Sequence, residues 1–189
     1  MKDRLKRALA ERPKITIERC DRIPAAVLIP LYESGGKNHI VFIKRTELVS
    51  THKGQYSFPG GARDLTDKSF LETALRESNE EIGLRVEDIE ILGELDDEIT
   101  TTSNFVMTPF VGFIPWPYVF TINEWEVDSI LTVPLGHLLD DRYLTRGTEE
   151  LEGNQIPSYS YDYKGHVIWG ATARILHKLL AILRSLEVT

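Results

Sequence analysis

The chain has few of the residues that build disulfide scaffolds, cysteine-rich zinc sites and membrane spans. Cys20 is the single cysteine among 189 residues, which excludes an intrachain disulfide and a zinc site made of several cysteines. No run of about 18 apolar residues occurs, and the opening MKDRLKRALAERPK lacks the apolar core of a signal peptide. We therefore expect a cytoplasmic protein that does not enter a membrane.

Positive charge is also in deficit. The chain has 22 Lys and Arg against 29 Asp and Glu, a net charge of −7, whereas a surface that binds nucleic acid is normally basic. We therefore expect no nucleic-acid partner, and a phosphorylated small-molecule substrate would need cations supplied locally. Hydrophobic residues at 42% and charged residues at 27% are typical of globular proteins, and the length suits a single domain over residues 1–189.

What the sequence does contain is concentrated between residues 58 and 84. The tetrapeptide FPGG at residues 58–61 predicts a chain reversal, because Pro fixes its own φ and Gly reaches conformations closed to other residues. The pattern that follows predicts a helix from Asp67 or Ser69 to Ile82, with Gly83 as its left-handed C-cap. One stripe of this helix is expected to face the core: Leu71, Ala74, Leu75, Ser78 and Ile82.

Three carboxylates lie on a different side of the predicted helix. Glu77, Glu80 and Glu81 are spaced i, i+3 and i+4, so their charges repel one another and destabilise the helix unless something positive joins them. Carboxylate oxygens on one rigid face are what a hard cation such as Mg²⁺ needs, with substrate phosphate and water completing its coordination. A solvated acidic face is the alternative, but the Gly-rich turn and Arg76 beside the acids favour a cation site.

The sequence RESNEEIGL at residues 76–84 resembles the R-E-U-x-E-E-x-G-U half of the Nudix box, in which U is a bulky aliphatic residue. Ser78 stands at a U position. Counting back from Arg76 places Lys68 at the first Glu of the box and Ala62 at its first Gly. The loop before the helix is therefore one residue longer than the general pattern, which is similar to the coenzyme A pyrophosphatase branch of the family.

The segment upstream of the turn also resembles that branch. Its motif has a strand ending in Arg-Ser or Arg-Ala, an Arg four residues on, and a Gly before Phe-Pro-Gly-Gly. Arg45 and Gly54 fit the motif, but Ser50 stands where the second Arg is expected. Lys53 or His52 is available to supply that positive charge.

The resemblance implies an α/β/α sandwich around a mixed β-sheet and a metal-dependent hydrolase that uses Mg²⁺ or Mn²⁺. Its substrate would be a nucleoside diphosphate linked to another moiety, with coenzyme A or an acyl-CoA yielding 3′,5′-ADP and 4′-phosphopantetheine. The departure at Ser50 keeps open ADP-ribose, other nucleoside diphosphate derivatives and nucleoside triphosphates. A nucleotide sensor without catalysis is an alternative of another class.

Roles for individual residues follow from the matching box positions. The resemblance makes Glu77 and Glu81 the principal metal ligands and Glu80 a further ligand or the base that orients water. Arg76 would hold these carboxylates in place, as a bidentate guanidinium can, so the catalytic set is Glu80, Glu81 and Arg76. Further candidates are substrate contacts, namely Arg45, Lys53, Gly60, Gly61 and Arg63, and an additional acid, namely Glu98, Glu124 or Glu126.

The rest of the chain is expected to supply the sandwich. Patterns predict helices over 2–11, 135–139 and 170–186, and strands over 25–31, 39–44, 89–95 and 104–114. Pro109 implies an edge position or a bulge, because Pro cannot donate to a strand ladder. Residues 140–165 are interpreted as turns with a hairpin that ends at residues 166–169. The apolar stripe of the last helix would pack on the core or on another chain, which leaves a homodimer open.

Overall fold

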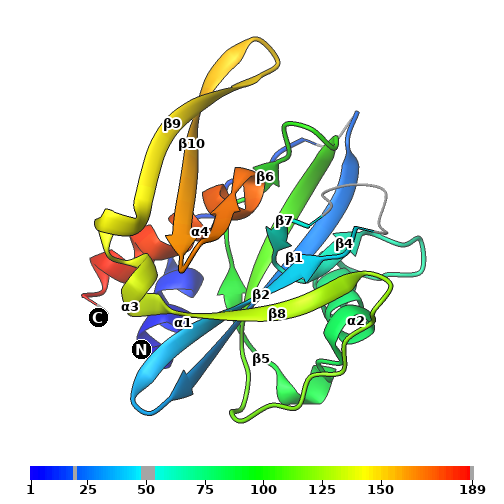
Figure 1. Cartoon of the computed structure of the whole chain (residues 1–189). Helices are drawn as coiled ribbons and strands as arrows, with labels where there is room; N and C mark the ends of the chain where they lie inside the picture. Colours follow the sequence, from blue (N-terminus) through cyan, green and yellow to red (C-terminus); the bar gives the residue numbers. More distant parts are fainter. Residues whose placement is uncertain (19–20, 48–53, 188–189) are drawn as a thin grey trace.

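The computed structural model describes residues 1–18, 21–47 and 54–187 (Figure 1). Helix α1 (Lys2–Glu11) has the predicted bounds and buries Leu5 and Leu9. Most of the strands that follow belong to one large sheet, which is interrupted in sequence by helix α2 (Phe70–Ile82). These strands are β1 (Ile23–Ser34), β2 (Lys37–Arg45), β3 (Tyr56–Ser57), β4 (Gly60–Ala62), β5 (Glu90–Glu94), β6 (Glu98–Ile99), β7 (Phe105–Phe113) and β8 (Val127–Pro134).

Within the described residues the large sheet has the order β3-β2-β1-β7-β5, with β4 beside β1, β6 beside β7 and β8 beside β2. Strand β1 pairs antiparallel with β2 and parallel with β7. The sheet is therefore mixed, and the predicted mixed α/β fold is confirmed.

Helices cover both faces of this sheet. Side chains of β1 alternate between two hydrophobic clusters: Ala26 and Leu28 pack in the cluster that contains Ala74 of α2, whereas Ile29 and Leu31 pack in the cluster formed with α1 and α4. Figure 1 shows α2 on one side of β1 and β2 and α1 with α4 on the other. The unbroken apolar run of β1 thus reflects burial on both faces.

Of the two alternatives predicted for Pro109, the edge position is wrong, whereas the pairing of β7 with β5 and β6 does shift register across this residue. Strand β7 lies inside the sheet, with β1 on one side and β5 and β6 on the other. Strand β5 pairs as far as Phe110 and β6 begins opposite Met107, so Pro109 falls between the two. Its carbonyl accepts a hydrogen bond from the Leu95 N–H at 2.9 Å. The missing N–H costs no ladder hydrogen bond there, which is why Pro is tolerated in an internal strand.

The hairpin predicted to end at residues 166–169 is present, and a further strand extends it into a second sheet. In the described residues it has three antiparallel strands, β9 (Leu144–Leu151), β10 (Asn154–Tyr163) and β11 (His166–Trp169). Strands β9 and β10 project from the body of the molecule (Figure 1). Helix α4 (Gly170–Ser185) follows β11 directly and packs on β10. The apolar residues of α4 that suggested a second chain are covered within this one: Ile175, Leu176, Leu179 and Leu183 are buried.

Short segments complete the fold. Helix α3 (Leu135–Leu138) follows β8 as predicted, and two 3₁₀ turns lie at η1 (Val86–Asp88) and η2 (Asp141–Tyr143). In the turn after β7, the ring of Trp116 stacks on Tyr32 with 3.9 Å between centroids, so this aromatic serves local packing. None of the described helices combines the length and the apolar character that a membrane crossing requires.

Candidate active site

Helix α2 is fixed at both ends by local contacts. At its start the Ser69 hydroxyl accepts from the Glu72 N–H at 3.1 Å, while the Glu72 carboxylate accepts from the Lys68 N–H at 2.6 Å, an arrangement close to a capping box. At its end Gly83 adopts φ 69° and its N–H donates to the Asn79 carbonyl. The sequence therefore determines where α2 begins and ends, and with it the direction of each acid.

Ser78 occupies a buried position where the Nudix pattern prefers an aliphatic residue. Its hydroxyl donates to the Ala74 carbonyl one turn earlier, at 2.6 Å. The hydroxyl hydrogen is thus satisfied within the helix, which removes most of the cost of burying it. The departure from the pattern does not disturb the helix.

Strand β4 carries two glycines that leave no room for a side chain, Gly60 because it lies against β1 and Gly61 because it lies against α2. Gly60 has φ 150°, and a Cβ there would lie 2.3 Å from the Ala26 carbonyl oxygen. Its N–H donates to Glu81 Oε2 at 2.9 Å. A Cβ on Gly61 would lie 2.6 Å from Cδ of Glu77. The Gly-Gly turn therefore allows the backbone to contact the helix carboxylates directly.

We predict that Gly61→Ala lowers kcat/KM by about 10- to 100-fold, because the added methyl group must displace the Glu77 carboxylate, and misplacement by about 1 Å can cost 10²-fold. Steady-state kinetics with and without Mn²⁺ would measure the loss. Gly136→Ala is the matched control, since a Cβ at Gly136 meets no atom within 4 Å. Equal losses in the two variants would contradict a role of the Glu77 carboxylate beside Gly61 in catalysis.

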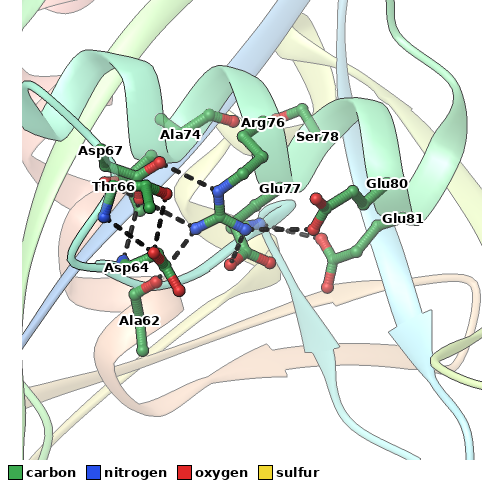
Figure 2. Close-up of polar contacts among 12 residues, drawn as sticks. Ala62, Asp64, Thr66, Asp67, Ala74, Arg76, Glu77, Ser78, Glu80 and Glu81 are labelled. Carbon is green, nitrogen blue, oxygen red and sulfur yellow. Dashed lines mark hydrogen bonds and ion pairs between the residues drawn. The ribbon is translucent and has the colours of Figure 1, made fainter.

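Arg76 lies at the centre of the acid cluster, as the sequence predicted. Its guanidinium donates to Glu77 Oε1 at 2.8 Å and to Glu80 Oε2 at 3.0 Å. The Ala62 carbonyl accepts a further bond at 3.3 Å. Figure 2 shows these contacts converging on one guanidinium. Arg76 thus offsets the repulsion between neighbouring acids, which the spacing on the helix makes unavoidable.

Asp67 is the strongest partner of Arg76, a role that the sequence did not predict. Its two carboxylate oxygens accept from Arg76 Nε at 3.0 Å and Nη2 at 2.9 Å, and also from the Thr73 hydroxyl at 2.9 Å. The bidentate Arg76 holds the pKa of Asp67 well below its usual range. The available clue was position: Asp67 directly precedes Lys68, where the general pattern places its first Glu.

Glu81 is the most buried of the three box acids. Its side chain is 1% exposed and has two donors, the Gly60 N–H and Arg45 Nη1 at 3.3 Å. Burial raises the pKa of Glu81 to about 8, and burial also raises the pKa of Glu77. Glu80 differs, because its side chain is 54% exposed. The structure therefore brings together two desolvated carboxylates and one that faces solvent.

The three candidates for an additional acid occupy different surroundings. Glu126, directly before β8, lines the same cavity as Glu77 and Glu81, and its charge contributes to the raised pKa of both. Glu98 is not part of that lining; its carboxylate pairs with Arg174 and Lys178, each at 2.8 Å. Glu124 is exposed and does not line the cavity either. Proximity to the box acids thus singles out Glu126.

The structure also places the candidate substrate contacts in different surroundings. Arg45 lines the cavity beside Glu81. Arg63 does not: its guanidinium donates to the Asp67 carbonyl at 2.9 Å and lies over the Phe70 ring, so it supports the loop before α2. Lys53, Ser50 and His52 lie outside the described residues.

These groups border a cavity of about 320 Å³, a volume in the range of small-molecule sites. Its floor is apolar and comes from β1, β7 and Phe58. Two stretches distant in sequence, residues 100–103 and 169–172, also line it. The polar residues of the α2 side are Arg45, Gly60, Gly61, Glu77, Glu81 and Glu126. The cavity therefore joins an acidic wall to an apolar floor.

The oxygen donors of this wall suit a hard divalent cation in chemistry and charge. In the described part of the chain no three His, Cys, Asp or Glu side chains form a ready-made metal-binding group, and Arg76 engages both Glu77 and Glu80. The buried Glu81 carboxylate provides the test of fit. Because burial raises its pKa, a cation beside it would stabilise its charged form. The residues therefore fit a hard divalent cation.

Comparison with known proteins places this geometry in a family. The NUDIX domain pattern matches residues 22–143. The chain is 36% identical over 155 residues to the uncharacterized Nudix hydrolase NudL of Photorhabdus laumondii, covering 82% of each chain. It is 30% identical over 190 residues to Nudix hydrolase 3 of Caenorhabditis elegans, covering 92% of this chain and 79% of that protein.

Solved structures share the fold at low sequence identity. A MutT/nudix family protein from Enterococcus faecalis superposes with a TM-score of 0.59 and 15% identity, covering 90% of this chain and 64% of that one. An Ap4A hydrolase from C. elegans superposes with a TM-score of 0.52 and 16% identity, covering 62% of this chain and 83% of that one. At such identities the likeness concerns the fold alone.

Proposed function

Because this chain belongs to the Nudix hydrolase family, we propose that its α2 carboxylates bind Mg²⁺ or Mn²⁺ and that it hydrolyses the diphosphate of coenzyme A or an acyl-CoA. Family membership makes it a hydrolase of pyrophosphate bonds in small nucleotide derivatives, an enzyme class that generally uses divalent metal ions. The identity of the metal, the roles of single residues and the substrate are our proposals.

One observation carries the proposal for the site. Glu77 and Glu81 contact the Gly60–Gly61 turn at a cavity that also includes Arg45 and Glu126. Carboxylates that can bind a metal ion, an arginine that can bind phosphate and a glycine turn without side chains therefore lie around one cavity. A diphosphate bound there would lie within reach of all three.

We assign Glu77 and Glu81 as principal ligands, with Glu126 as the additional acid. When bound, a divalent cation reduces the charge of the diphosphate, promotes deprotonation of the attacking water and stabilises the leaving oxygen. Glu80 faces solvent, where its carboxylate can orient that water or accept its proton. Arg45 supplies positive charge to the diphosphate, and Arg76 keeps Glu77 and Glu80 in position.

The preference for coenzyme A rests on the sequence pattern around the cavity. Arg45, Gly54 and the FPGG turn match the branch that cleaves coenzyme A, and the loop before α2 has that branch's length. Ser50 departs from the pattern, and it lies outside the described residues. ADP-ribose and other nucleoside diphosphate derivatives are the competing substrates.

Product analysis tests the proposal. Purified protein is incubated with coenzyme A, ADP-ribose, NADH or dGTP, each with Mg²⁺ or Mn²⁺, and the products are identified by mass spectrometry. We expect 3′,5′-ADP and 4′-phosphopantetheine from coenzyme A, with no product in EDTA or with Glu81→Gln. Cleavage of another compound with coenzyme A untouched would refute the substrate. Binding of these nucleotides without any cleavage would instead indicate a sensor.

A further inference from the structure

Part of the cavity lining has no role in the proposed hydrolysis. It consists of residues 100–103, in the loop between β6 and β7, and residues 169–172, at the junction of β11 and α4. We call these two stretches the distal lining. They come from parts of the chain far from the box, yet they border the same space as Glu77 and Glu81.

The distal lining is held in place by contacts outside the cavity wall. The Tyr56 hydroxyl and His166 Nδ1 lie 2.7 Å apart, which fixes β11 beside β3. Arg174, in the second turn of α4, is 5% exposed and donates to the Glu98 carboxylate at 2.8 Å and to the Ile99 carbonyl at 2.6 Å. These bonds join the start of α4 to the strand that leads into residues 100–103. The two stretches are therefore joined into one surface.

Trp169 is the aromatic side chain of this surface. It lines the cavity although 49% of its surface is exposed. The two other tryptophans are placed differently: Trp116 stacks on Tyr32, and Trp125 is 77% exposed but does not line the cavity. An exposed indole face beside a binding cavity offers a stacking surface for a planar ring.

Buried polar atoms point to the same space. Among the described residues, four buried side-chain nitrogen or oxygen atoms have no hydrogen-bond partner. Three of them belong to residues that line this cavity: Arg45 Nε, Ser57 Oγ and Ser103 Oγ. Buried polar groups of folded proteins are nearly always paired, so each exception needs an explanation. These atoms are closed to solvent, so a bound molecule can supply the partners of the two serine hydroxyls when their side chains rotate toward the cavity.

We propose that the distal lining binds the nucleoside half of the substrate, with the base stacked on Trp169 and the Ser103 hydroxyl bonded to a polar group of the nucleoside. The inference rests on the proposed function, since it assumes a diphosphate beside Arg45 and the Gly60–Gly61 turn. It adds which half of the substrate lies where. A planar aromatic base matches an exposed indole and isolated hydroxyls better than the flexible chain of pantetheine does.

The test uses adenosine and pantetheine as separate probes in EDTA, so that it depends on neither metal nor hydrolysis. Saturation-transfer-difference NMR on the full chain should show adenine protons receiving saturation from the wild-type protein. We expect Trp169→Ala to reduce this signal at least about fivefold, because base stacking on an aromatic contributes roughly a factor of 10 or more to affinity. Trp169→Phe should retain most of it, and Ser103→Ala should weaken it.

Trp125→Ala is the matched control, because Trp125 is an exposed indole outside the cavity lining. An unchanged adenosine signal in Trp169→Ala, an equal loss in Trp125→Ala, or saturation of pantetheine that depends on Trp169 would each overturn the proposal. Kinetics gives a second readout: Trp169→Ala should raise KM about tenfold with kcat within about twofold. If the wild-type protein cleaves none of the compounds and Trp169→Ala still loses adenosine binding, the proposed hydrolysis is refuted and this subsite is not.

Discussion

Glu81→Gln is expected to lower kcat by about 10³-fold while the protein stays folded. A neutral amide binds Mg²⁺ poorly, and a loss of about 4 kcal/mol of transition-state stabilisation corresponds to about this factor. The amide oxygen of Gln can still accept the Gly60 N–H that Glu81 now accepts. Steady-state kinetics with saturating Mg²⁺, together with a urea titration, would measure both properties.

The stability measurement separates a catalytic role from a structural one. Glu81 is almost fully buried, and burial raises its pKa, so its charge is costly to the fold. The free energy of unfolding of Glu81→Gln should therefore equal or exceed that of the wild type, although the variant loses activity. Glu87→Gln is the control, since the Glu87 side chain is 71% exposed. A Glu81→Gln protein with kcat within tenfold of wild type would refute the assignment of Glu81.

Arg76→Met is expected to lower the free energy of unfolding by about 3 kcal/mol and to reduce activity as well. The substitution leaves the Asp67 carboxylate, whose side chain is 3% exposed, without its bidentate partner, and breaking a buried ion pair typically costs about 3–5 kcal/mol. It also frees Glu77 and Glu80 to repel each other. Urea titrations at pH 7 measure the first effect and kcat/KM the second.

The pH dependence of the same variant has a definite sign. The pKa of Asp67 is depressed in the folded protein, so its stabilising contribution is present above the ordinary Asp value of 3.8 and is lost as the pH falls below it. The difference between wild type and Arg76→Met should therefore be smaller at pH 3 than at pH 7.

Two further variants test the origin of the Arg76 effect. Adding Asp67→Asn should recover part of the lost stability, because no unpaired charge then remains. Arg63→Met is the matched control: Arg63 also donates to Asp67, but to its carbonyl rather than its carboxylate. A change below about 0.5 kcal/mol in Arg76→Met, the usual range for surface substitutions, would show that the network does not stabilise the fold.

Features that depend on neighbours along the chain were predictable. The bounds of α2 follow from Ser69 and Glu72 at one end and Gly83 at the other, all within one turn of the residues they cap. The apolar run at residues 25–31 is typical of a buried strand, and the two hydrophobic clusters show that β1 is buried on both faces. The spacing of Glu77, Glu80 and Glu81 required a positive partner, and Arg76 is one to five residues away from them.

Features that depend on contacts between distant segments were not predictable from the sequence. Pro109 suggested an edge strand, but its tolerance inside the sheet depends on where β5 ends and β6 begins. Glu98 and Glu126 were equivalent acids in the sequence, and only the fold gives Glu98 two cations from α4 and places Glu126 in the cavity. The position of Asp67 beside Lys68 was a clue, but only the fold shows that its carboxylate binds Arg76.

The sequence by itself determined the acidic helix, its caps, the Gly-Gly turn before it and, through these, the family. Hydrogen bonds within a turn and periodic burial depend on residues a few positions apart, and such pairs can be recognised in the chain. The tertiary structure alone decided that residues 100–103 and Trp169 border the same cavity as Glu81. Their proximity results from sheet pairing and from the Arg174 ion pairs, whose partners are separated by tens of residues and leave no local pattern.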